Sequence, residues 1–186
     1  MSNLNFNIVG AGAMGHLWAS FLSFHDFEIT LYARHKQPSK SFLVESELGS
    51  FEQKIDYKVL SDWQPADVTL VCVKAHQLEK LCSQLNKLNI SSGRLILIMN
   101  GMGLLEVVEK HLPQMQNLHL STTHGAYIKG NRIIHTGSGL TLFGNLNSSF
   151  DSVNYSDLIF QLNRVLPRVQ WNQDHAHSMY LKLLSL

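Results

Sequence analysis

The sequence has few cysteines, little excess charge and no long apolar run, and each absence excludes a class of protein. Its two cysteines, Cys72 and Cys82, are too few for a disulfide framework or a cysteine-based zinc site. A formal net charge of +1 gives no general attraction to nucleic acid or to an acidic membrane surface. No apolar stretch reaches the roughly 18 residues of a membrane span, and no signal-like segment opens the chain. We therefore expect a cytoplasmic protein with reduced, structural cysteines.

A recognisable metal-binding motif is also missing, although the chain contains ten histidines. His175 and His177 are two positions apart, so they do not share one face of a helix. The H-E-x-x-H pattern does not occur. We expect no metal site, and we expect His124 to be a hydrogen-bonded structural histidine rather than a ligand or a base.

What the sequence does contain is a glycine-rich segment directly after a short apolar strand. Gly10, Gly12 and Gly15 follow a predicted strand at residues 4–9 and precede a helical pattern over residues 16–22. At this G-x-G-x-x-G spacing the first glycine permits a tight turn, the second lets backbone approach a pyrophosphate, and the third lets the helix pack closely. The phosphate then lies on N–H groups at the helix N-terminus. A turn without a ligand is the alternative, but a second strand at βαβ distance favours dinucleotide binding.

The end of that second predicted strand, residues 27–32, indicates which dinucleotide is bound. A cofactor with a free ribose 2′-hydroxyl is usually held there by Asp or Glu. This chain has Arg34 and Lys36 instead, and an arginine can pair with a 2′-phosphate through two N–H groups. The sequence therefore favours NADP over NAD, while ordinary loop charges remain the alternative for both residues.

Alternating strand and helix patterns predict an α/β fold with a Rossmann-type, doubly wound parallel sheet. Apolar runs at residues 67–73 and 94–99 are typical of parallel strands that are covered on both faces. A helical stripe follows each run, at residues 78–88 and 104–112. Further predicted elements are weak short strands at 42–44 and 57–60, a strand at 118–123, a hairpin of 127–128 with 132–135, a short strand at 140–144, a helix through 158–166 and an edge strand at 168–171.

The chain ends in a predicted apolar helix from about Asp174, with no glycine cap, proline or polar tail before Leu186. An apolar helix of this kind needs a partner, either a further domain or a second subunit. We favour a missing C-terminal domain, so residues 1–172 are expected to form an NADP-binding domain and residues 173–186 to begin another. A homodimer through this helix is the alternative.

Several motifs occur together in one order along the chain. They are the glycine loop, Val73-Lys74-Ala75-His76-Gln77, Asn100-Gly101-Met102-Gly103, Thr122-Thr123-His124-Gly125-Ala126 and Lys182-Leu183. Together they resemble the ketopantoate reductase (2-dehydropantoate 2-reductase) family. The resemblance implies reduction of 2-dehydropantoate to pantoate by NADPH, a step of pantothenate and coenzyme A synthesis. It also implies a Rossmann-type domain followed by a helical domain, with the active site between them.

The resemblance also assigns roles to individual residues. Arg34 matches the residue that selects the 2′-phosphate, Asn100 an asparagine near the nicotinamide and substrate, and Lys182 the general acid. A lysine suits the last role because negative charge develops on the ketone oxygen as hydride arrives. The other implied cofactor contacts are Gly10, Ala11, Gly12, Ala13, Met14 and Gly15 of the phosphate loop, Lys74 and Gln77 beside the adenosine, and Ala126 through its backbone.

Two departures from the family pattern qualify these roles. Leu186 stands where the family usually has a substrate-binding asparagine, and the helical domain with further substrate-binding residues is expected to be missing. We therefore expect this chain to bind cofactor better than it turns over substrate. A stand-alone NADP-binding module without catalysis, and a reductase of another 2-keto acid, are the alternative functions.

Overall fold

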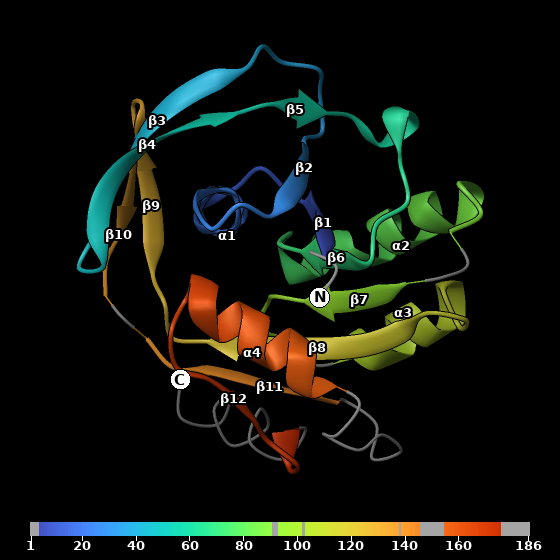
Figure 1. Ribbon diagram of the computed structural model, residues 1–186. Coiled ribbons are helices and arrows are strands. Elements are labelled where there is room, and N and C mark those ends of the chain that lie inside the picture. The colour runs from blue at the N-terminus through green and yellow to red at the C-terminus, as the bar shows by residue number, and fades with distance from the viewer. Residues whose placement is uncertain (1–3, 91–92, 102, 138, 146–154, 176–186) are drawn as a thin grey trace.

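The computed structural model describes residues 4–90, 93–101, 103–137, 139–145 and 155–175. Its main element is an eight-stranded sheet with the order β12-β11-β8-β7-β6-β1-β2-β5 (Figure 1). β1 lies between β2 and β6, so the chain adds strands to one side of β1 and then to the other. The strands are β1 (Asn5–Val9), β2 (Glu28–Tyr32), β5 (Tyr57–Lys58), β6 (Val68–Val71), β7 (Arg94–Leu97), β8 (Gln116–Thr122), β11 (Thr141–Asn145) and β12 (Val169–Trp171).

Helices cover both faces of this sheet, which confirms the predicted doubly wound α/β fold. α1 (Ala13–Phe24) and α4 (Ser156–Val165) pack on one face, and α2 (Leu78–Lys87) and α3 (Leu104–His111) pack on the other. Successive strand residues supply the two cores, since Ile96 packs with α1 and α4 while its neighbours Leu95 and Leu97 pack with α2 and α3. Every residue of β6 is buried, as the apolar run predicted.

One end of the sheet departs from the predicted parallel pattern. β8 and β11 pair antiparallel, whereas β12 again runs parallel to β11. The reason lies in the connection, because the chain between β8 and β11 forms a β-hairpin at residues 126–135 rather than a crossover helix. A parallel neighbour needs such a crossover, and a chain that returns through a hairpin arrives in the opposite direction.

The sequence patterns did not predict the second sheet. It has the order β4-β3-β10-β9, in which β9 (Ala126–Lys129) and β10 (Arg132–His135) form the predicted hairpin. β3 (Lys40–Ser46) and β4 (Gly49–Ile55) form a second hairpin, which in the sequence follows β2 and precedes β5. α1 lies between the two sheets (Figure 1). Its Phe21 ring contacts the rings of Phe51 in β4 and His135 in β10.

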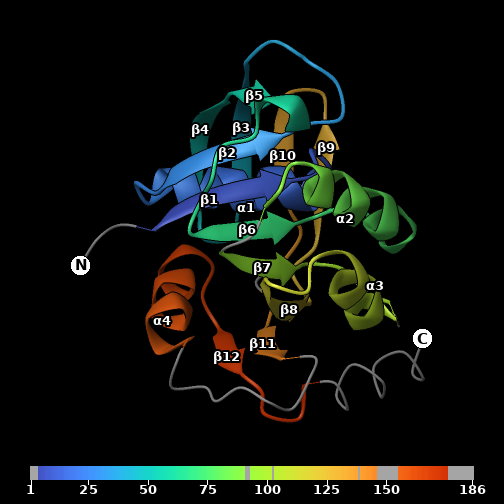
Figure 2. The ribbon, with the colours of Figure 1, turned by 90° about the vertical axis from the view of Figure 1, so that its right-hand side faces the viewer.

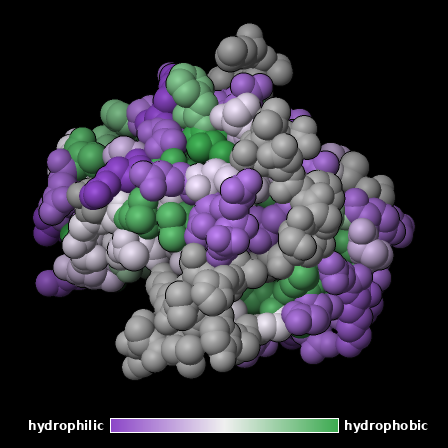
Figure 3. All heavy atoms as spheres, turned by 90° about the horizontal axis from the view of Figure 1, so that it is seen from below, coloured by the Kyte–Doolittle hydropathy of each residue, from purple (hydrophilic) through white to green (hydrophobic). Residues whose placement is uncertain are grey.

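The remaining described elements are two short 3-10 helices, η1 (Leu60–Asp62) and η2 (Ala75–Gln77). Within the described part of the chain, no helix is long and apolar enough to cross a membrane. Seen from below, the surface carries hydrophilic residues along its right-hand side and hydrophobic residues in separate groups (Figure 3). The predicted final helix lies mostly in residues 176–186, outside the described residues, so its packing and the expected boundary near residue 172 stay predictions.

Candidate functional site

The candidate site lies at the carboxyl edge of the main sheet, beside the switch point between β1 and β6. In Figure 2 the arrowheads of β2, β6 and β7 point the same way, and the loops that follow them lie at that edge. The loop after β6 contacts the glycine loop, which follows β1, and it also contacts the loop after β7. A Cβ atom on Gly10 would lie 2.7 Å from the Cys72 carbonyl oxygen, and one on Gly101 would lie 3.2 Å from Cβ of Ala75. The loops after β1, β6 and β7 therefore form one continuous surface.

The three glycines of the loop differ in their surroundings. Gly10 has a φ of +115°, a conformation that side chains disfavour. A Cβ atom on Gly15 would lie 1.9 Å from the Gly10 carbonyl oxygen, so α1 packs against the loop only because residue 15 has no side chain. A Cβ atom on Gly12 would meet no described heavy atom within 4 Å. Gly10 and Gly15 thus shape the loop, while Gly12 leaves space open beside it.

α1 presents its N-terminus to that open space. Gly12 is the N-cap residue, and among the described residues no side chain caps the helix. The first turn, which the structure describes in full, contains no acidic residue. The first N–H groups of a helix have no partner within the helix, and they carry its partial positive charge. Ala13 and Met14 belong to this turn, so the predicted loop residues include a helix end of the kind that can bind an anion; that they bind one stays a prediction.

Basic residues follow the two strands that flank β1 in the sheet. Arg34 follows β2, and it lies exposed in a run with His35 and Lys36. The backbone N–H of Ala33 donates to the Lys58 carbonyl at 2.9 Å, which ties the start of this run to β5. Lys74, also exposed, follows β6. Exposed basic residues therefore follow the neighbouring strand on each side of β1.

Gln77 has a local structural contact that the sequence did not predict. Its Oε1 atom accepts a hydrogen bond from the Lys74 backbone N–H at 3.3 Å, which closes the turn between β6 and α2. Ala126 is the first residue of β9 and is half-buried. Neither observation tests the proposed cofactor contacts of these residues, which stay predictions.

Asn100 is exposed in the loop after β7, next to a carbonyl group that a histidine holds in place. His119 Nε2 donates to the Met99 carbonyl at 2.7 Å, and Nδ1 of the same ring lies 2.7 Å from His175 Nε2. His119 and His175 are buried. The sequence did not predict this pair, because the two residues are 56 positions apart and no local pattern connects them. Lys182, the predicted general acid, lies outside the described residues.

The most direct support of the glycine loop comes from two residues that the sequence analysis did not assign. The imidazole of His16 lies between the Gly12 carbonyl, 2.9 Å from Nδ1, and the Tyr57 hydroxyl, 2.8 Å from Nε2. Burial lowers the pKa of His16, with a smaller lowering contribution from Lys40 and an opposing one from the Gly12 hydrogen bond. The position of His16 four residues after Gly12 indicates contact with the loop, whereas no sequence signal indicates Tyr57.

The cysteines are free, as expected, whereas His124 is only partly satisfied, because its buried Nε2 has no hydrogen-bond partner among the described residues. Both cysteines are free, and burial raises the pKa of Cys72 to about 12, so its thiol does not act as a nucleophile at neutral pH. Nδ1 of His124 accepts from the Gly139 N–H at 3.0 Å and lies 2.9 Å from His135 Nε2. Within the described residues, no three His, Cys, Asp or Glu side chains are grouped to hold a metal ion.

Comparison with known proteins places this site in a wider context. Residues 6–148 match the family model described as "Ketopantoate reductase PanE/ApbA". The chain is 34% identical over 184 residues to the 2-dehydropantoate 2-reductase of Yersinia pestis, covering 97% of this chain and 58% of that protein. The chain therefore spans less than two thirds of the length of this curated relative.

Solved structures with the same fold include enzymes with other substrates. A 2-dehydropantoate 2-reductase from Geobacter metallireducens GS-15 superposes with a TM-score of 0.84 at 17% identity, over 98% of this chain and 62% of its own. D-mandelate dehydrogenase, solved with NADH and anilino(oxo)acetate, superposes with a TM-score of 0.79 at 22% identity, over 96% of this chain and 60% of its own. At these identities the likeness establishes the fold.

Proposed function

Because the chain belongs to the ketopantoate reductase family, we propose that it binds NADPH and serves the reduction of 2-dehydropantoate to pantoate. The observation that supports this most is the glycine loop. Gly15 allows α1 to approach the loop, and Gly12 leaves open space in front of the uncapped helix N-terminus. This combination of close packing on one side and free backbone on the other suits a pyrophosphate.

The residues present fit a nicotinamide dinucleotide with a 2′-phosphate. We assign the pyrophosphate to the N–H groups of residues 12–15 and the 2′-phosphate to Arg34, with Lys74 and Gln77 beside the adenosine. Ala126 completes the set through its backbone. Arg34 is exposed, and the segment from Ala33 to Lys40 contains no acidic residue that would repel a phosphate.

In the proposed reaction the reduced nicotinamide supplies the hydride, and the chain supplies orientation and a proton. Asn100, on the loop after β7, orients the keto acid through its amide group. Lys182 donates a proton to the ketone oxygen as negative charge develops there, which requires an ammonium group within hydrogen-bond distance.

Activity measurements separate this proposal from a binding module without catalysis. We expect 2-dehydropantoate-dependent oxidation of NADPH by this chain, followed at 340 nm, to fall at least about a hundredfold in Lys182→Ala, because general acids contribute on that order. Lys54→Ala, an exposed lysine on β4, is the matched control and should retain the rate. No turnover by the wild type, despite NADPH binding, would support the binding module, and faster turnover of a different 2-keto acid would replace the substrate.

Two further parts of the proposal concern the setting of the protein. We place it in the cytoplasm, where NADPH and coenzyme A synthesis are found. As the alternative to coverage by a further domain, we also propose self-association through the apolar, leucine-rich segment at residues 174–186. Sedimentation velocity at rising concentration tests this, and a purely monomeric profile would contradict it.

A further inference from the structure

His16 and Tyr57 connect the glycine loop to an edge strand, and the chemistry of each contact fixes its direction. A carbonyl oxygen can only accept a hydrogen bond, so His16 Nδ1 carries the proton that is shared with the Gly12 carbonyl at 2.9 Å. In a neutral ring, Nε2 is then an acceptor, and the Tyr57 O–H donates to it at 2.8 Å. The exposed fraction of His16 is 4%, so water does not compete freely for either contact.

The Gly12 carbonyl is held by two donors from the same residue. The backbone N–H of His16 donates to it at 3.0 Å, in addition to the ring Nδ1–H. The Gly12–Ala13 peptide bond is trans, so its C=O and N–H groups point in opposite directions. Holding the carbonyl toward the helix therefore aims the Ala13 N–H in the opposite direction, out of the N-terminal end of α1.

Neighbouring rings limit the movement of the imidazole. Phe42 of β3 packs edge-on against it, with ring centroids 5.1 Å apart, and the Tyr57 ring lies 5.7 Å away. Burial raises the pKa of Tyr57, so its hydroxyl keeps its proton and remains a donor. The second sheet and β5 thus hold His16 in the orientation that the Gly12 contact requires.

β5 also contacts the segment before Arg34, the residue to which we assign the 2′-phosphate of the nucleotide. Tyr57 and Lys58 pair in parallel with Leu31 and Tyr32 at the end of β2. The Lys58 carbonyl accepts from the Ala33 N–H at 2.9 Å, one residue before Arg34. A strand of only two residues therefore supports the glycine loop through a side chain and the Arg34 segment through its backbone.

We propose that His16 and Tyr57 are positioning residues for the dinucleotide: Tyr57 orients the His16 ring, which holds the Gly12 carbonyl and so aims the Ala13 N–H at the pyrophosphate. The inference rests on the proposed NADPH binding, because a loop without a nucleotide has no need of a fixed N–H direction. The roles of the two phosphate regions are separable, since Tyr57 acts on the glycine loop through its hydroxyl alone.

The test compares two ligands on four variants by fluorescence or calorimetric titration. The ligands are NADPH and adenosine 2′-monophosphate, which lacks the pyrophosphate. Tyr57→Phe should weaken NADPH binding about fivefold, the equivalent of one hydrogen bond. His16→Leu, which loses both contacts, should weaken NADPH binding about tenfold or more. His16→Asn keeps a donor near the Nδ1 position and should recover part of that loss. Tyr155→Phe, a buried tyrosine at the start of α4, is the matched control.

The two ligands distinguish positioning from general damage. Binding of adenosine 2′-monophosphate should change by less than about twofold in all four variants, and circular dichroism should show the wild-type fold. Equal NADPH affinity in wild type, Tyr57→Phe and His16→Leu would overturn this inference alone, as would a parallel loss of both ligands. A wild-type chain that does not bind NADPH would overturn the proposed function together with it.

Discussion

Gly12 and Gly15 are three positions apart and have opposite requirements. A side chain on Gly15 would collide with the Gly10 carbonyl, whereas a side chain on Gly12 would enter open space. The G-x-G-x-x-G spacing predicts the roles of both glycines, because each role recurs in loops of this type. The spacing does not show that a substitution of Gly15 should reduce stability whereas one of Gly12 should reduce nucleotide binding.

We therefore expect Gly15→Ala and Gly12→Ala to fail in different assays. Gly15→Ala should lower the free energy of unfolding by about 3 kcal/mol, because α1 must move away from the loop. Gly12→Ala should lower it by less than about 1 kcal/mol, the usual scale of an N-cap exchange, and yet weaken NADPH at least about tenfold. Urea unfolding and nucleotide titration of both variants give the comparison. Equal stability of the two would contradict the packing described for Gly15.

Buried histidines predict a pH dependence of stability. Burial is the main cause that lowers the pKa of His16, His124 and His135, with the His135 charge a further cause for His124. Unfolding restores the ordinary value near 6.5, so the unfolded chain binds more protons under acidic conditions. The stabilisation is fully present above about pH 6.5 and is lost as the pH falls through that value toward the lower folded pKa values.

Urea unfolding at pH 7.5 and pH 5.5 measures this loss. We expect a clearly lower free energy of unfolding at pH 5.5, and a smaller difference between the two pH values in His124→Asn. The exposed His35 provides the control, since His35→Asn should keep the full difference. A chain equally stable at both pH values would show that these rings accept protons without loss of the fold.

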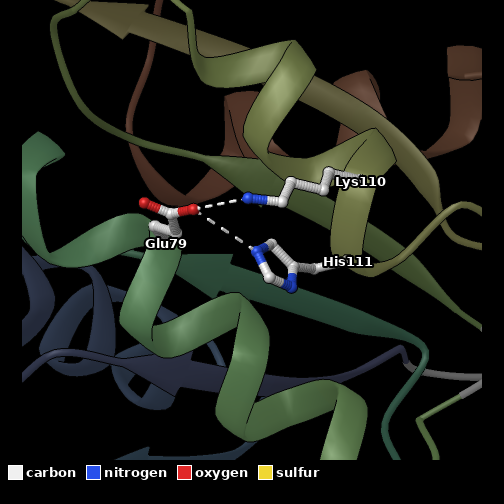
Figure 4. Close-up of polar contacts among 3 residues, drawn as sticks. All are labelled: Glu79, Lys110 and His111. Atoms are coloured by element: carbon white, nitrogen blue, oxygen red, sulfur yellow. Dashed lines mark hydrogen bonds and ion pairs between the residues drawn. The ribbon is translucent and has the colours of Figure 1, made fainter.

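At the scale of elements, α2 and α3 meet through two kinds of contact. On the surface, Glu79 of α2 pairs with Lys110 of α3 at 2.9 Å and approaches His111 at 3.7 Å (Figure 4). The Lys110 hydrogen bond is the main cause that lowers the pKa of Glu79. In the interior, Leu85 of α2 belongs to a buried cluster that also contains residues of α3 and of the sheet. Solvent screens the ion pair, because about 61% of the Glu79 side chain is exposed.

The apolar contact should therefore dominate the ion pair. We expect Leu85→Ala to lower the free energy of unfolding by about 3 kcal/mol, since it leaves a cavity in a closed core. Glu79→Gln should leave the urea midpoint essentially unchanged. Thermal and urea unfolding of both variants provide the measurement, and a larger effect of Glu79→Gln would reverse the ranking.

The elements that sequence patterns predicted are those with strong local signals. The apolar run of β6 and the leucine stripe of α2 each lie within one short segment of sequence. Both could therefore be recognised without knowledge of the three-dimensional structure. β4 has an alternating burial pattern in which only Ile55 is fully buried, and its side chains are mostly polar. Its pairing with β3 and the packing of the second sheet on α1 depend on contacts distant in sequence, which no local pattern contains.

At the scale of the whole molecule, the candidate site is a set of loops that the sheet topology brings to one edge. The sequence order of the motifs predicted the family and the α/β fold, and both are confirmed. The support behind the loops could not be predicted, because Tyr57 is 41 positions from His16 and the two meet only in the folded chain. The roles of Asn100 and Lys182 stay predictions.

NADPH selectivity is the most direct test of the proposed function. Fluorescence titration of the chain with NADPH and NADH, in the wild type and in Arg34→Ala, measures it. We expect NADPH to bind about tenfold to a hundredfold more tightly than NADH, the range of a charged hydrogen bond, and Arg34→Ala to remove the difference. Absence of binding by both nucleotides, or equal affinity for them in the wild type, would contradict NADPH as the cofactor of this chain.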